Sequence, residues 1–226
     1  MWKSAIAGAL VAVLIVATIA AGAFYYVTHA RRVTPLSGSD EVVLVFASSA
    51  PDGASVAGLV SIVAQGRLRD VSPDTTVTVP GTSFSRLSDA YVFGGGAGVS
   101  RALGRQQSGS LRPYVVIPSE VWRHMVDASG GLLVTVPTEV TEFDGSRLST
   151  IRAGEQTLTA EAVGSVLRSL SYVPPDEQST LRGALEQRLA ALLVRESSAP
   201  NALQSNLSPS VLDAWRTQVL PGVVGR

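Results

Sequence analysis

The sequence lacks cysteine entirely and contains only two histidines, His29 and His124, among 226 residues. Without cysteine the chain can form no disulfide, no thiolate zinc site, no iron–sulfur cluster and no cysteine nucleophile. Two histidines are too few for a histidine-rich metal centre. The 18 basic residues, of which only Lys3 is a lysine, are balanced by 18 acidic residues. The chain therefore lacks the basic excess with which nucleic-acid-binding proteins neutralise phosphates, and no nucleic-acid partner is expected.

Residues 4–27 contain no charged side chain. As a helix, this run would extend about 36 Å at about 1.5 Å per residue, which is enough to cross a bilayer. We expect a retained single-pass anchor that follows a short tail of residues 1–3. The alternative is a cleaved signal peptide ending at Ala21-Gly22-Ala23, but the length of the apolar run favours the anchor. Both interpretations place the rest of the chain outside the cytoplasm.

The remainder has the composition of one globular domain, since the chain is 46% hydrophobic and 16% charged. Residues 28–40 are predicted to be a linker, residues 41–220 the domain and residues 221–226 a C-terminal tail. Apolar runs predict strands at residues 41–47, 58–64, 75–79, 113–117 and 132–136. Helical patterns occupy residues 99–103, 120–128, 160–170, 176–194 and 209–220, with Thr159 and Ser208 as N-caps of the third and fifth. The interleaving predicts an α/β (α+β) fold, with a central mixed β-sheet and helices on both faces, preceded by one transmembrane helix.

General catalytic motifs are absent: there is no P-loop, no G-x-S-x-G and no H-E-x-x-H. Residues 94–98, GGGAG, precede a predicted helix and offer backbone amides to an anion. They lack the Rossmann spacing, so a purely conformational role for these glycines is the alternative. His124 has no exported histidine beside it except His29, and we expect an ordinary surface or interface histidine.

Several short motifs follow one another in an informative order. Residues 87–91 read LSDAY and are followed by glycines. Residues 126–131 read VDASGG and residues 134–137 read VTVP. Residues 153–158 read AGEQTL, and residues 206–208 read NLS. In this order and spacing the motifs resemble the LytR-CpsA-Psr domain, which is found in membrane-anchored envelope proteins of Gram-positive bacteria.

The resemblance implies an extracytoplasmic phosphotransferase. Such enzymes move a glycopolymer from a polyprenyl-pyrophosphate carrier onto peptidoglycan. Arginines bind the pyrophosphate, acidic residues hold Mg²⁺, and the lipid tail lies in an apolar pocket between sheet and helices. Guanidinium groups suit phosphate oxygens, and a divalent ion offsets charge at the bridging oxygen.

The resemblance also suggests particular site residues. They are Arg168, Asp176 and Arg182 for catalysis, Arg86, Arg168 and Arg182 for pyrophosphate binding, and Asp52 for Mg²⁺. The alternative for Arg86 and Asp52 is an ordinary loop position. The alternative for Arg168 and Arg182 is a solvated helix arginine, with Arg182 and Glu186 as an i,i+4 pair.

Other positions depart from the family pattern. Residues 78–83 match the family's S-I-P-R-D-T segment, with Gly81 and Thr82 in place of its arginine and aspartate. In other segments uncharged residues replace charged ones at Ser55, Leu170 and Ser179, and Gly183 replaces a glutamine. Because charge-assisted contacts stabilise phosphoryl-transfer transition states, these changes predict weakened or lost catalysis.

Two functions follow from these observations. The first is a working transferase with an altered site. The second is a degenerate relative that holds a polyprenyl-phosphate lipid or glycopolymer intermediate, or that pairs with an active paralogue in the same membrane. The substituted positions favour the second for chemistry. Both place the chain in a bacterial cell membrane, crossing it once, with its C-terminal domain extracytoplasmic.

Overall fold

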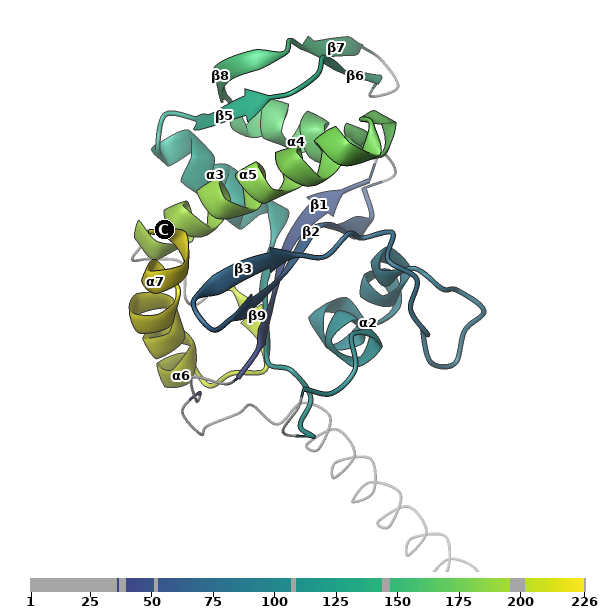
Figure 1. The fold of residues 1–226 in the computed structure, drawn as a ribbon, viewed down its shortest axis with the longest axis vertical. Helices are drawn as coiled ribbons and strands as arrows, with labels where there is room; N and C mark the ends of the chain where they lie inside the picture. The colour runs from purple at the N-terminus through teal and green to yellow at the C-terminus, as the bar shows by residue number, and fades with distance from the viewer. Residues whose placement is uncertain are drawn as a thin grey trace, which may run out of the picture.

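The computed structural model describes residues 36, 40–50, 53–106, 109–143, 147–195 and 202–225. Its centre is a five-stranded sheet in the order β3-β2-β1-β4-β9 (Figure 1). The strands are β1 (Val42–Ser49), β2 (Ser55–Ala64), β3 (Arg67–Asp70), β4 (Tyr114–Ile117) and β9 (Gln204–Ser205). β1 pairs antiparallel with β2 and parallel with β4, so the sheet is mixed, as the sequence predicted.

Helices cover both faces of this sheet. They are α2 (Leu87–Ala102) on one face and α3 (Ser119–Ala128), α4 (Ala160–Ser169) and α5 (Pro175–Arg195) on the other (Figure 1). Along β1, Val43 and Val45 are buried on the α2 side, whereas Leu44 and Phe46 belong to the larger core beneath α3, α4 and α5. A strand that is buried on both faces explains the unbroken apolar run that predicted it.

Two small sheets lie beyond α3, α4 and α5, on the side away from the central sheet (Figure 1). They pair β5 (Leu132–Val136) with β8 (Gly154–Leu158), and β6 (Val140–Phe143) with β7 (Leu148–Ile151). The predicted strand at residues 132–136 is therefore confirmed as a strand, but it pairs outside the central sheet. The three other strands of these sheets were not predicted.

The predicted strand at residues 75–79 is wrong. Thr76 forms only an isolated bridge with Arg86, and the strand next to β2 is β3, at Arg67–Asp70. The sequence R-L-R-D carries three charges in four residues, so it lacks the apolar run on which strand prediction depends. β3 lies at the edge of the sheet and pairs with β2 alone, a position at which charged side chains are common.

Four of the five predicted helices begin within one residue of the predicted start, and two of these begin at the expected N-caps. The Thr159 hydroxyl accepts from the amide of Ala162 at 3.2 Å, and the Ser208 hydroxyl from that of Val211 at 3.4 Å. The predicted helix at residues 99–103 is wrong in extent, because it is only the end of α2, whose glycine-rich sequence gives little apolar periodicity. The last predicted helix, residues 209–220, is α6 (Pro209–Ala214) followed by a π-helical turn, η3 (Trp215–Val219). A further short helix, α7 (Pro221–Val224), lies in the predicted tail, and a 3₁₀ turn, η1 (Leu170–Tyr172), follows α4.

The glycine-rich stretch at residues 94–98 lies within α2, at a break between two helical segments. Gly95 has φ of 54° and interrupts the helical dihedral angles. A Cβ added to Gly96 would lie 2.4 Å from the ring of Tyr114 and 2.6 Å from the side chain of Val116, so this glycine lets α2 pack closely on β4. The geometry supports the conformational role. His124 is exposed on α3, as expected.

The predicted anchor at residues 4–27, and residues 28–35 and 37–39 of the predicted linker, lie outside the described residues. No helix in the described ranges is both long enough and apolar enough to cross a bilayer.

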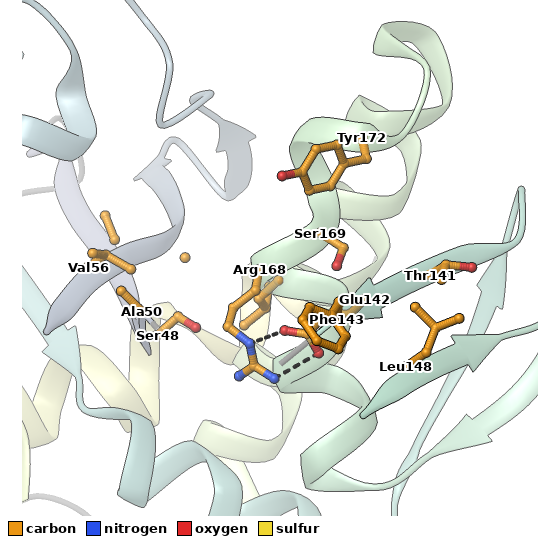
Figure 2. A pocket seen from close by; sticks show the side chains of 13 residues that line it. Ser48, Ala50, Val56, Thr141, Glu142, Phe143, Leu148, Arg168, Ser169 and Tyr172 are labelled. Atoms are coloured by element: carbon orange, nitrogen blue, oxygen red, sulfur yellow. Dashed lines mark hydrogen bonds and ion pairs between the residues drawn. The ribbon is translucent and has the colours of Figure 1, made fainter. Parts of the chain in front are cut away.

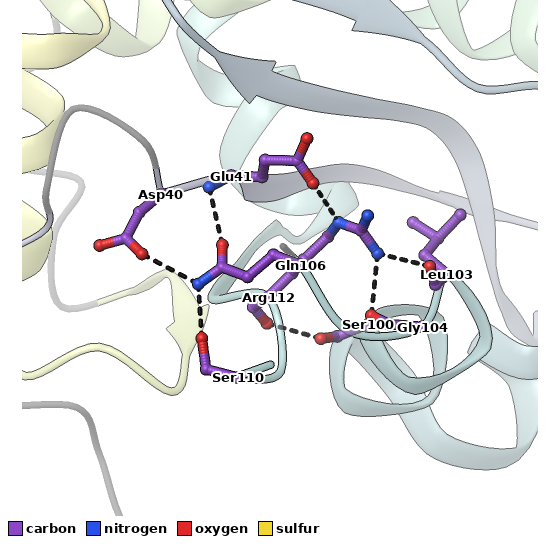
Figure 3. A network of polar contacts seen from close by, with 8 residues as sticks. All are labelled: Asp40, Glu41, Ser100, Leu103, Gly104, Gln106, Ser110 and Arg112. Atoms are coloured by element: carbon purple, nitrogen blue, oxygen red, sulfur yellow. Dashed lines mark hydrogen bonds and ion pairs between the residues drawn. The ribbon is translucent and has the colours of Figure 1, made fainter. Parts of the chain in front are cut away.

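A polar network ties the start of β1 to the end of α2 (Figure 3). The Gln106 amide accepts from the backbone N–H of Glu41 at 3.0 Å and donates to Asp40 at 2.9 Å. Arg112 pairs with the Glu41 carboxylate at 2.5 Å and donates to the backbone carbonyl oxygens of Leu103 and Gly104. The Arg112 guanidinium group therefore links the residue before β1 to the residues that follow α2.

We expect Arg112→Ala to lower the free energy of unfolding by about 2–3 kcal/mol, because it leaves a half-buried carboxylate and two carbonyls without their donor. Urea denaturation followed by tryptophan fluorescence measures this. Arg101→Ala, at an exposed arginine of α2, should change the value by less than about 0.5 kcal/mol. Equal losses for the two variants would contradict the role of the network.

Candidate functional site

A cavity of about 710 Å³ lies where the ends of β1 and β2 meet α4 and β6 (Figure 2). This volume is typical of cavities that hold small organic ligands. Most of its wall is apolar; the lining residues are Ser48, Ala50, Val56, Ala57, Gly58, Thr141, Glu142, Phe143, Leu148, Leu167, Arg168, Ser169 and Tyr172. We call it the main cavity.

The rim of the main cavity carries large exposed side chains. Phe143 is 64% exposed, Leu148 65% and Tyr172 83%. Scattered exposed apolar residues are normal on protein surfaces, but a group of them around a cavity is typical of a binding groove. The main cavity is therefore suited to an elongated apolar ligand that extends onto the surface.

Arg168 and Glu142 form the charged pair of the main cavity (Figure 2). The Arg168 Nε and Nη2 atoms donate to the two Glu142 carboxylate oxygens, the second at 2.9 Å. The Arg168 side chain is 20% exposed and that of Glu142 is 9% exposed. Arg168 also donates to the hydroxyl of Ser165 on its own helix, at 3.4 Å.

A second cavity, of about 110 Å³, adjoins the main one. Ala57, Gly58, Leu167 and Arg168 line both. The walls that belong to the small cavity alone include Pro73, Asp74, Leu170, Ser171, Gln178 and Arg182. Arg168 therefore lies at the junction of an apolar cavity with a polar one, and the structure brings it together with Arg182 as the sequence suggested.

Arg182 is buried, not solvated. Its Nε atom lies 3.1 and 3.0 Å from the two Asp70 carboxylate oxygens, and its Nη1 atom donates to Gln178 at 2.5 Å. Asp70 is the last residue of β3, so the guanidinium joins α5 to the edge of the sheet. The alternative of a solvated helix arginine is wrong for Arg182.

Glu186 lies one turn further along α5 and is 1% exposed. Its pKa rises from the ordinary 4.5 to about 9, mainly because burial disfavours the charged carboxylate and also because the Asp70 carboxylate is close. The Ser61 hydroxyl and the Arg182 guanidinium act in the opposite direction. At neutral pH Glu186 is therefore a protonated carboxyl group beside the Asp70–Arg182 ion pair.

The remaining predicted site residues are less central. Arg86 lies 3.8 Å from Asp74, and both side chains are more than half exposed. Asp176 is exposed in the first turn of α5 and lines neither cavity. Asp52 lies outside the described residues.

Sequence analysis missed two residues of these cavities, Asp74 and Glu142. Asp74 occurs in the segment S-P-D-T, residues 72–75, which matches the S-I-P-R-D-T segment without its isoleucine and arginine. The structure places this segment, rather than Gly81 or Thr82, beside Arg168 and Arg182. Only a weak indication of Glu142 was present in the sequence. In β6 alternate residues are buried, so that the charged Glu142 points inward and the apolar Phe143 outward, whereas a strand usually buries its apolar residues.

The described carboxylates near the cavities lie close to arginines. Asp70, Asp74 and Glu142 each have an arginine as partner. Among the described residues there is no group of three or more histidine, aspartate or glutamate side chains that could hold a metal ion.

Comparison with known proteins finds similarity in structure alone. No protein-family model and no curated protein sequence matches the chain. The LytR-Csp2A-Psr enzyme from Actinomyces oris superposes with a TM-score of 0.57 and 16% identity, over 82% of this chain and 80% of that one. The protein gbs0355 from Streptococcus agalactiae gives 0.60 and 12%, over 82% and 74%. TagT of B. subtilis gives 0.53 and 17%, over 85% and 80%.

These identities are too low to transfer an activity, but the superpositions cover most of each chain. They agree with the motif order seen in the sequence and with the layers of Figure 1. The described part of the chain therefore has the fold of the LytR-CpsA-Psr proteins.

Proposed function

We propose that this chain is a membrane-anchored protein of the bacterial cell envelope that binds a polyprenyl-pyrophosphate-linked glycopolymer intermediate outside the cytoplasm, with weakened or lost transfer to peptidoglycan. The observation that carries the proposal is the position of Arg168, at the junction of the apolar main cavity and the small polar one. An amphiphile with an apolar tail and an anionic head requires this combination of surfaces.

The tail is proposed to lie in the main cavity. Val56, Leu167 and Phe143 provide apolar contacts on three different elements. Burying a prenyl chain against them contributes roughly 25 cal/mol per Å² of apolar surface. TagT, which shares the fold, has been solved bound to LIIa-WTA, and this supports a related occupant here.

The head is proposed to contact Arg168 next to the small cavity. A guanidinium fork suits phosphate oxygens. Asp70 and Glu142, however, already pair with Arg182 and Arg168, so the positive charge at this site is largely offset. Together with Ser55, Leu170 and Ser179 at positions where the family has charged residues, this supports binding with little or no catalysis.

A second candidate function is binding of a protein partner in the same membrane, such as a paralogue. The observation that favours it is a pair of exposed aromatic rings, Phe84 before α2 and Phe93 within it, with centroids 5.0 Å apart. Exposed aromatic groups are enriched at protein interfaces. This function does not depend on the cavities, so it is distinguishable from the first.

Thermal unfolding of the full chain in detergent, with three probes, tests the first proposal. Farnesyl pyrophosphate carries tail and head, farnesol the tail alone, and inorganic pyrophosphate the head alone. At 100 times its Kd, farnesyl pyrophosphate should stabilise the protein by about 2.7 kcal/mol. Arg168→Ala should reduce this response, while Arg101→Ala, at the exposed arginine on α2, should leave it unchanged. No response to farnesol or farnesyl pyrophosphate would overturn lipid binding and leave the partner function as the candidate.

A further inference from the structure

Glu142 is an unusual residue for the wall of an apolar cavity. β6 is short and exposed at Thr141 and Phe143, yet the glutamate between them points inward and is 9% exposed. Burying a carboxylate is costly unless a cation and hydrogen bonds compensate it. Arg168 supplies both, through two of its nitrogen atoms.

The pairing is two-pronged, with Nε and Nη2 each on a different oxygen of the same carboxylate (Figure 2). A guanidinium group uses this same fork to bind the oxygens of a phosphate. Glu142 therefore occupies, from within the protein, the Nε–Nη2 face of Arg168, which is one of the two faces with which a guanidinium group binds phosphate oxygens. The two residues are 26 positions apart in sequence and belong to different layers, α4 and β6.

We infer that Glu142 determines the affinity and specificity of the main cavity, because an anionic headgroup can bind the Arg168 fork only by displacing the Glu142 carboxylate. This inference rests on the proposed function, since it concerns the same cavity and the same ligand class. While the pair is intact, the two charges cancel, and the carboxylate repels an approaching phosphate. Displacement costs the pair its two hydrogen bonds.

One consequence concerns which ligands bind. A free phosphate or pyrophosphate must meet the whole cost of displacement from its contacts with Arg168 alone. A prenylated pyrophosphate also buries its tail against Val56, Leu167 and Phe143, which offsets that cost. The cavity is thereby selective for lipid-linked over free phosphates, and an uncharged prenol binds without disturbing the pair.

An alternative role for Glu142 is to orient Arg168 for the ligand. The two roles predict opposite changes in the affinity for an anionic ligand when the Glu142 charge is removed. Glu142→Gln keeps the size of the side chain and removes its charge. If the carboxylate competes with the headgroup, the Kd of farnesyl pyrophosphate should fall about ten-fold, while that of farnesol should stay the same. If the carboxylate positions Arg168, farnesyl pyrophosphate should bind more weakly.

The experiment is calorimetric titration of the full chain with farnesyl pyrophosphate, farnesol and inorganic pyrophosphate, for wild type and Glu142→Gln. Glu161→Gln is the matched control, because Glu161 also pairs with an arginine, Arg147, but is 69% exposed; its affinities should equal those of wild type. Glu142→Asp, which keeps the charge but shortens the reach, is the second variant. It should tighten binding by a few-fold and serves if Glu142→Gln does not fold.

Tighter binding of farnesyl pyrophosphate to Glu142→Gln, with farnesol unchanged, supports the inference. Unchanged or weaker binding, with wild type still binding, overturns it and leaves the proposed function standing. If neither wild type nor any variant binds farnesyl pyrophosphate or farnesol, the proposed function fails and the inference fails with it. A ten-fold gain for farnesol as well as for farnesyl pyrophosphate also overturns the inference, because the effect would then be on the tail.

Discussion

Arg182→Ala is expected to lower the free energy of unfolding by about 3–5 kcal/mol, which is the usual cost of removing one partner of a buried ion pair. The Arg182 side chain is only 8% exposed, and it holds the Asp70 carboxylate at 3.0 Å. Without the guanidinium, Asp70 would lie beside Glu186 with no cation to balance it. Urea denaturation followed by the fluorescence of the buried Trp122 and Trp215 measures the change.

Two controls identify the cause. Arg188→Ala, at an exposed arginine of the same helix, should cost less than about 0.5 kcal/mol. Adding Asp70→Asn to Arg182→Ala should recover part of the loss, because it removes the uncompensated charge. If Arg182→Ala is as stable as wild type, Arg182 is not the structural link between α5 and β3, and its role as a site residue regains weight.

Glu186→Gln is expected to stabilise the protein at neutral pH and to flatten its dependence of stability on pH. The pKa of Glu186 is about 9 in the folded protein, and 4.5 is its ordinary value. Between these values the folded state binds a proton that the unfolded state has released, so stability falls as pH rises from 4.5 towards 9. At pH 7 the cost is on the order of 3 kcal/mol. An amide resembles the protonated carboxyl group and does not ionise, so the variant avoids this cost.

The measurement is the free energy of unfolding between pH 5 and pH 9 for wild type and Glu186→Gln. The wild-type curve should fall more steeply, by up to about 1.4 kcal/mol per pH unit for one proton. Glu161→Gln, at an exposed glutamate, should follow wild type. Parallel curves for wild type and Glu186→Gln would mean that Glu186 titrates normally and that the cluster is arranged differently.

Local pattern was enough to predict most of the central fold. Residues 42–47 of β1 are all apolar because both faces of the strand are covered, and the caps Thr159 and Ser208 fix two helix starts. β3 and β6 escaped prediction because each has only four residues and little apolar periodicity. The pairing of β5 with β8, rather than with the central sheet, is a tertiary property that no local signal contains.

Site residues that belong to a local sequence motif could be predicted. Contacts between residues that are distant in the sequence could not. Arg168 and Arg182 could be suggested from the resemblance, and the structure brings both to one cavity. Their partners Glu142 and Asp70 lie 26 and 112 positions away. The packing of strands and helices creates these pairs. As a result, each arginine is an ion-paired residue inside the protein, whereas the sequence suggested a solvated or a phosphate-binding cation.

The most direct test of the central claim is a crystal structure of the protein with farnesyl pyrophosphate. The account predicts that the prenyl chain lies between Val56, Leu167 and Phe143, with the pyrophosphate on Arg168 and the Glu142 carboxylate moved away from it. An unoccupied main cavity at saturating ligand, or a pyrophosphate bound elsewhere with the Arg168–Glu142 pair intact, would contradict it.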